Sequence, residues 1–175
     1  MRSFITLLGI ALGIVVLAIL NLSVAYLLPY PLNKLNIIFA IVIVLIMVRG
    51  VGVMVWVTFF SHFLIELYTV TPFGVTLFAA TIAVLLSFWL YETVVTNRSW
   101  YAALALSVCA ITLYRLLYLG TLSFSRLFSS DVNIPFGRIL PLYGWEVFFT
   151  TILVCIGYAA LSPFAKKMDP HTLRF

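Results

Sequence analysis

Long apolar stretches, separated by short polar ones, run through the whole sequence and determine which solvent it can fold in. Residues 4–28, 35–48 and 73–94 contain Glu92 as their only charged residue. A helix needs about 20 such residues to cross the hydrocarbon core of a bilayer. Of all residues 65% are hydrophobic and 9% charged, whereas about a quarter are charged in soluble domains. The chain lacks the polar surface that water requires, so we expect it to fold in lipid.

The sequence predicts an all-α, polytopic integral membrane bundle of about six transmembrane helices. Helices are the expected form because backbone groups in lipid must be hydrogen-bonded within the protein, and the ten-residue alternating segments of a membrane β-barrel are not seen. Residues 1–165 are predicted to form one bundle and residues 166–175 a short basic tail. Residues 32–48 are short for a span and predict either a short membrane helix or a partly re-entrant one. The expected helices are 4–28, 32–48, 51–68, 73–94, 100–120 and 141–161.

The net charge of +5 is explained by membrane topology rather than by nucleic-acid binding. Lysine and arginine concentrate in the cytoplasmic loops of membrane proteins. With six spans and a cytoplasmic N-terminus, six of these residues fall inside and three outside, which predicts that both termini are cytoplasmic. The inner set is Arg2, Arg49, Arg98, Lys166, Lys167 and Arg174, and the outer set is Lys34, Arg126 and Arg138.

Three charged residues are predicted to lie inside the membrane at similar depth, toward the external leaflet: Glu66, Arg115 and Glu146. Such residues are costly to bury unless they are paired, and they are functional candidates for that reason. We expect Arg115 to pair with Glu66, with Glu146 or with both. The favoured interpretation is a lock that fixes the register of the helices; a partner or ligand site and unpaired snorkelling are the alternatives.

His62 lies one helical turn before Glu66, on the same face of the predicted helix. A His–Glu pair can relay a proton, but a polar pair inside the bundle is the favoured interpretation. Zinc binding is not expected, because no third ligand has a recognisable spacing and His171 lies in the tail. No phosphate-binding loop, nucleophile elbow or HExxH motif is present. The sequence therefore predicts no enzyme activity, no cofactor and no metal.

The segment FLIELYTVTPFGVTLFAATIAVLL, residues 63–86, resembles the central region of the rod shape-determining protein MreD family. That family has an apolar helix ending in Asp-Leu, a short turn, Pro-Leu-Gly and another apolar helix. Here Glu66-Leu67 stands in place of Asp-Leu, and Pro72-Phe73-Gly74 in place of Pro-Leu-Gly. The resemblance covers about residues 35–120, and Glu in place of Asp is a departure from the family pattern.

The resemblance implies a non-enzymatic scaffold of the cell-elongation machinery in the bacterial inner membrane. Its partners would be the bilayer, an MreC-like protein, the cytoskeletal protein MreB and wall-synthesis enzymes, and it offers no catalytic residues to transfer. The bundle is also similar to the substrate-binding subunit of energy-coupling-factor transporters. In that alternative, Glu66, Arg115 and a polar connection over residues 121–140 would hold a vitamin-like ligand.

Overall fold

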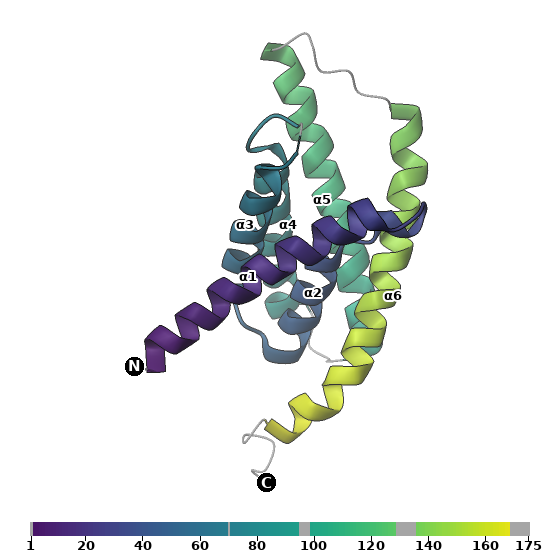
Figure 1. Ribbon diagram of the computed structural model, residues 1–175. Coiled ribbons are helices and arrows are strands. Elements are labelled where there is room, and N and C mark those ends of the chain that lie inside the picture. The colour runs from purple at the N-terminus through teal and green to yellow at the C-terminus, as the bar shows by residue number, and fades with distance from the viewer. Residues whose placement is uncertain (1, 70, 95–98, 129–135, 169–175) are drawn as a thin grey trace.

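The computed structural model describes residues 2–69, 71–94, 99–128 and 136–168, and these residues form helices joined by short connections (Figure 1). The all-α prediction is confirmed: the described ranges contain six α-helices, one short 3-10 helix and no strand. The elements are α1 (Arg2–Leu27), η1 (Leu32–Lys34), α2 (Ile37–Arg49), α3 (Val53–Glu66), α4 (Val75–Thr93), α5 (Trp100–Phe128) and α6 (Phe136–Met168).

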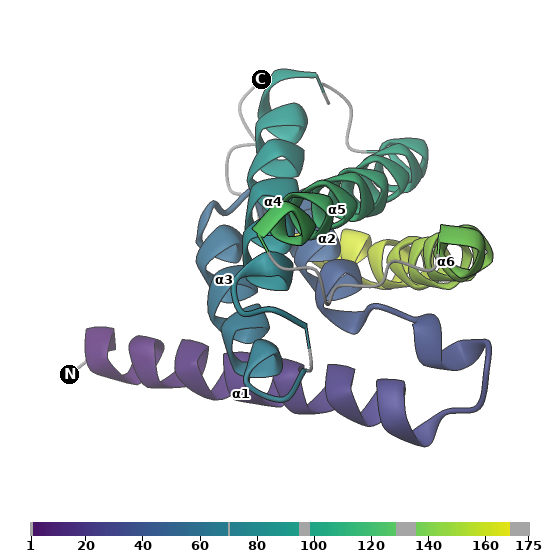
Figure 2. The ribbon, with the colours of Figure 1, turned by 90° about the horizontal axis from the view of Figure 1, so that it is seen from above.

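Helices α2 to α6 run alternately up and down in Figure 1, whereas α1 crosses the others obliquely. Along the chain α3 packs on α4, α4 on α5 and α5 on α6, and α6 also packs on α2. α1 lies mainly against α3 (Figure 2). Ala18 is its one buried core residue among those described. Most of the α1 surface is therefore left for lipid or for another protein.

α2 is the centre of the bundle, since it contacts all five other α-helices. Six of its side chains have no exposed surface: Ile38, Phe39, Val42, Ile43, Ile46 and Met47. A helix that is apolar on all sides is expected to be buried on all sides. The sequence of α2 therefore accounts for its central position.

Four helices in the described part of the chain are long and apolar enough to cross a membrane, fewer than the six predicted. They contain the segments Leu7–Leu27, Val75–Thr93, Trp100–Ser125 and Pro141–Pro163. α2 has 13 residues and α3 has 14. At 1.5 Å per residue they are about 20 Å long, which is short of a hydrocarbon core of about 30 Å.

The predicted long polar connection over residues 121–140 is largely helical instead. α5 continues to Phe128 and α6 begins at Phe136, so the predicted ends at 120 and 141 were wrong. The polar side chains of this stretch are accommodated within α5, where the hydroxyls of Thr121 and Ser125 donate to main-chain carbonyls of the preceding turn. α6 also runs to Met168, while residues 129–135 and 169–175 lie outside the described residues.

Candidate functional site

Arg115 on α5 and Glu146 on α6 form an ion pair inside the bundle. Nε and Nη2 of Arg115 both donate to Oε2 of Glu146. The Glu146 side chain is 4% exposed and that of Arg115 is 27% exposed. The guanidinium also lies near the ring centroids of Tyr114 and Tyr118, at 5.5 and 5.8 Å. The predicted pairing of Arg115 with Glu146 is thus present, and it ties α5 to α6.

The same carboxylate also reaches the start of α2. Nδ2 of Asn36 donates to Oε1 of Glu146 over 3.4 Å, and the Asn36 side-chain oxygen accepts from Phe39 N over 3.2 Å. Asn36 N donates to Thr150 Oγ1 over 3.1 Å. Ile37 N donates to Oδ1 of Asn21, on α1, over 3.1 Å. Four helices, α1, α2, α5 and α6, therefore meet in one polar network.

This network explains why α2 is short. Glu146 and Thr150 lie inside the apolar segment Pro141–Pro163 of α6, so α2 begins partway along that segment rather than at its end. The first N–H groups of any helix have no partner within the helix, and in a membrane interior water is not available to them. Asn21, Asn36 and Thr150 supply the missing acceptors. Residues 32–48 thus form η1 and α2 rather than one continuous helix, and the two alternatives for how they lie in the membrane stay predictions.

Of the alternatives predicted for Arg115, the structure shows the pair with Glu146, and Glu66 forms no ion pair among the described residues. Its carboxylate caps the next helix instead: Oε1 accepts from Thr76 N at 2.9 Å and from Leu77 N at 3.4 Å. Glu66 is the last residue of α3 and is 3% exposed. A negative charge at a helix N-terminus is favourable, because the helix dipole is positive there.

The turn between α3 and α4 contains the residues that carry the family resemblance, and three of them, Glu66, Pro72 and Gly74, shape the start of α4 together. Gly74 precedes α4 with φ of 98°, a conformation that costs other L-residues about 1–2 kcal/mol. Val75 N donates to Pro72 O at 3.4 Å. Oε1 of Glu66 then accepts hydrogen bonds from the N–H groups of Thr76 and Leu77, in the first turn of α4. Leu67, the other signature residue, is 59% exposed and lies outside this arrangement.

His62 is buried at 3% exposure beside α2 and α5. Its Nδ1 lies 3.0 Å from Thr58 O, in the preceding turn of α3. Its ring centroid is 5.9 Å from that of Phe39 and 6.3 Å from that of Tyr114. No hydrogen bond joins His62 to Glu66 among the described residues. The geometry therefore gives this pair no direct path for a proton.

Two buried polar atoms of α3 have no hydrogen-bond partner within the described protein: Oε2 of Glu66 and Oγ of Ser61. The described residues also contain no group of three His, Cys, Asp or Glu side chains that could hold a metal ion. The site consists of two separate clusters, one around Glu146 and one around Glu66. Each cluster connects helices to one another.

Sequence reasoning missed Asn36 and Thr150. Asn36 directly precedes the apolar run 37–48 of the predicted helix 32–48. Asn is a preferred residue at the position just before a helix. That preference was the available signal. Thr150 offered none, because threonine in an apolar helix usually bonds to its own backbone.

No model of a known protein family matches the chain, and comparisons with curated proteins and with solved structures also find no match.

Proposed function

We propose that this protein is a non-enzymatic membrane scaffold of the cell-elongation machinery, which binds partner membrane proteins through its helices and loops. The observation that carries the proposal is that the chain itself uses both carboxylate oxygens of Glu146 and one of the two of Glu66. Glu146 binds Arg115 and Asn36, and Glu66 caps α4. Groups engaged in this way hold helices in place and leave little polar surface to select a small molecule.

The α3–α4 turn supports the assignment to an MreD-like role. The features behind the resemblance are an acidic residue at a helix end and a Pro-x-Gly turn. In this chain Glu66 binds the N–H groups that directly follow Gly74. An acidic residue and a glycine at this spacing thus have a structural reason to occur together, without any catalytic role.

The proposal places the chain in the bacterial inner membrane with both termini in the cytoplasm. α1 begins and α6 ends in the lower part of Figure 1, where the α2–α3 turn also lies. Arg2, Arg49 and Lys166 belong to those three elements. Positive charge at one end of the bundle is the pattern of a cytoplasmic face.

The test is purification of the tagged chain from its native host in mild detergent, followed by native mass spectrometry. The expected result is a complex with an MreC-like protein or with wall-synthesis enzymes, together with loss of rod shape when the chain is depleted. A stoichiometric vitamin-like ligand bound together with coupling ATPases would overturn the proposal and assign the chain to an energy-coupling-factor transporter.

A further inference from the structure

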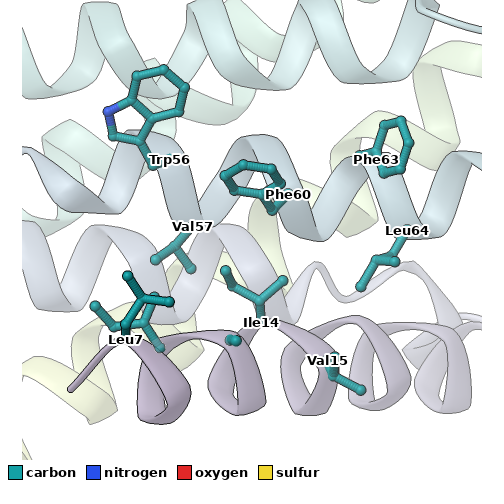
Figure 3. Close-up of a pocket in the computed structure, with 10 residues that line it drawn as sticks. Leu7, Ile14, Val15, Trp56, Val57, Phe60, Phe63 and Leu64 are labelled. Carbon is teal, nitrogen blue, oxygen red and sulfur yellow. The ribbon is translucent and has the colours of Figure 1, made fainter. Parts of the chain in front are cut away.

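An apolar groove of about 520 Å³ lies between α1 and α3. From α3 it is lined by Trp56, Phe60 and Phe63, and from α1 by residues that include Leu7 and Ile14 (Figure 3). Every lining residue is apolar. Trp56 is 63% exposed and Phe60 is 46% exposed. The groove therefore opens sideways from the bundle, and a ligand that fills it must itself be apolar along its length.

The groove has the length of a lipid chain in one leaflet. Its α3 wall runs from Trp56 to Leu64, and eight residues at 1.5 Å each give about 12 Å. Half of a hydrocarbon core of about 30 Å is about 15 Å. A volume of several hundred Å³ is also typical of a small-molecule pocket. A single acyl chain of one leaflet satisfies these dimensions.

Positive charge lies at the end of the bundle nearest Trp56, where α3 begins. Arg49 is exposed in the last turn of α2, and a short turn at Gly50–Gly52 leads from it into α3. α1, whose Leu7 lies beside Val57 in Figure 3, begins at Arg2 on this side. Basic residues at a membrane surface attract anionic lipids. The apolar groove and the basic end together match the two parts of a phospholipid.

We propose that the groove between α1 and α3 binds one acyl chain of an anionic phospholipid, with the phosphate held near Arg49. The lipid belongs to the leaflet on the Arg49 side of the bundle. It would fill the space between the obliquely placed α1 and the rest of the bundle. The proposal does not depend on which partner proteins the chain binds.

The test measures lipid binding to the purified chain by native mass spectrometry, with phosphatidylglycerol and phosphatidylcholine of identical acyl chains. We expect phosphatidylglycerol to be retained in preference to phosphatidylcholine. Arg49→Gln should weaken phosphatidylglycerol binding about fivefold, the effect of one basic residue near an anionic surface. Lys34→Gln, in η1 beyond the other end of α1, is the matched control and should leave binding unchanged.

The groove itself is tested by filling it. Ala11→Trp places a large side chain in the groove and should reduce retention of both lipids. Leu12→Trp is the control, because Leu12 is 66% exposed and does not line the groove. Equal retention of the two lipids by the native chain, or unchanged retention in Ala11→Trp, would overturn the proposal. So would a dimer that Ala11→Trp abolishes, because a second copy would then occupy the groove. If Ala11→Trp fails to fold, the Arg49→Gln comparison still decides the question.

Discussion

Glu146 is the residue on which most of the bundle converges. It lies on α6 and accepts hydrogen bonds from Arg115 of α5 and Asn36 at the start of α2. Its side chain is 4% exposed, whereas that of Arg115 is 27% exposed. Loss of Arg115 would leave a carboxylate buried without its counter-ion, and the loss of one partner from a buried pair typically costs about 3–5 kcal/mol.

A charge-reversal series tests this pairing. Arg115→Glu should strongly reduce the folded fraction, because two carboxylates would then face each other in the bundle. Adding Glu146→Arg should restore part of the stability, but not all, since the new arginine would lie near the positive end of the α2 dipole. Adding Glu66→Arg should restore none. Thermal unfolding in detergent, followed by size-exclusion chromatography, measures the outcome. Rescue by Glu66→Arg but not by Glu146→Arg would contradict the structure.

The sequence was sufficient to find the charges but not their partners. Glu66, Arg115 and Glu146 stood out because ionisable residues in apolar segments are rare and costly. The predicted depth of these residues in the membrane placed both glutamates within reach of Arg115. Which glutamate pairs with Arg115 depends on which helices pack together. It also depends on the turn after α3, which brings the N-terminus of α4 to Glu66. That information is tertiary and leaves no mark on the local sequence.

At the scale of elements, the cap on α4 makes the α3–α4 turn sensitive to one side chain. Glu66→Leu should cost roughly 1–3 kcal/mol, because the N–H groups of Thr76 and Leu77 would lose their acceptor in a partly buried turn. Glu66→Gln keeps an oxygen in place and should cost less. The midpoints of thermal unfolding of the two variants provide the comparison. Equal losses would mean that the charge of Glu66, and not its hydrogen bonds, stabilises the turn.

The second element-scale prediction concerns the contact between α2 and α6. A Cβ at Gly157 would lie 3.1 Å from Cγ2 of Val44, whereas one at Gly144 would meet nothing within 4 Å. Gly157→Leu should therefore destabilise the bundle by about 1–3 kcal/mol through overpacking. Gly144→Leu, in the same helix, is the control. A larger loss of thermal stability in Gly144→Leu would contradict the packing of α2 on α6.

Helix type followed from hydropathy, but several helix ends did not. Leu32 and Leu35 continue the apolar pattern toward α2, yet the helix begins only after Asn36, whose side chain caps Phe39 N. Thr121 and Ser125 suggested a loop, but their hydroxyls bond within α5. In both places a polar side chain bonds to the backbone, and hydropathy cannot distinguish a cap from an internal bond.

At the scale of the whole molecule, the turns at the two ends of the bundle carry different side chains. Arg49 lies at the α2–α3 turn, and α4 ends near it, since a Cβ at Gly50 would contact Tyr91 at 3.5 Å. The α3–α4 turn lies at the opposite end and carries exposed Leu67, Tyr68 and Phe73. Aromatic residues gather at both membrane–water interfaces, whereas basic residues concentrate on the cytoplasmic side. The proposed orientation, with Arg49 inside, therefore places the α3–α4 turn outside.

Cysteine accessibility in intact cells tests that orientation. Tyr68 and Val94 are 70% and 66% exposed, at opposite ends of the α3–α4 pair. In a background with Cys109→Ala and Cys155→Ala, Tyr68→Cys should react with a membrane-impermeant maleimide added outside. Val94→Cys should react only after permeabilisation. The reverse labelling pattern would mean that the bundle has the opposite orientation in the membrane. It would also place Arg49, and with it the proposed lipid site, in the outer leaflet. The excess of basic residues at that end would then lie outside the cell, contrary to the usual concentration of lysine and arginine on the cytoplasmic side.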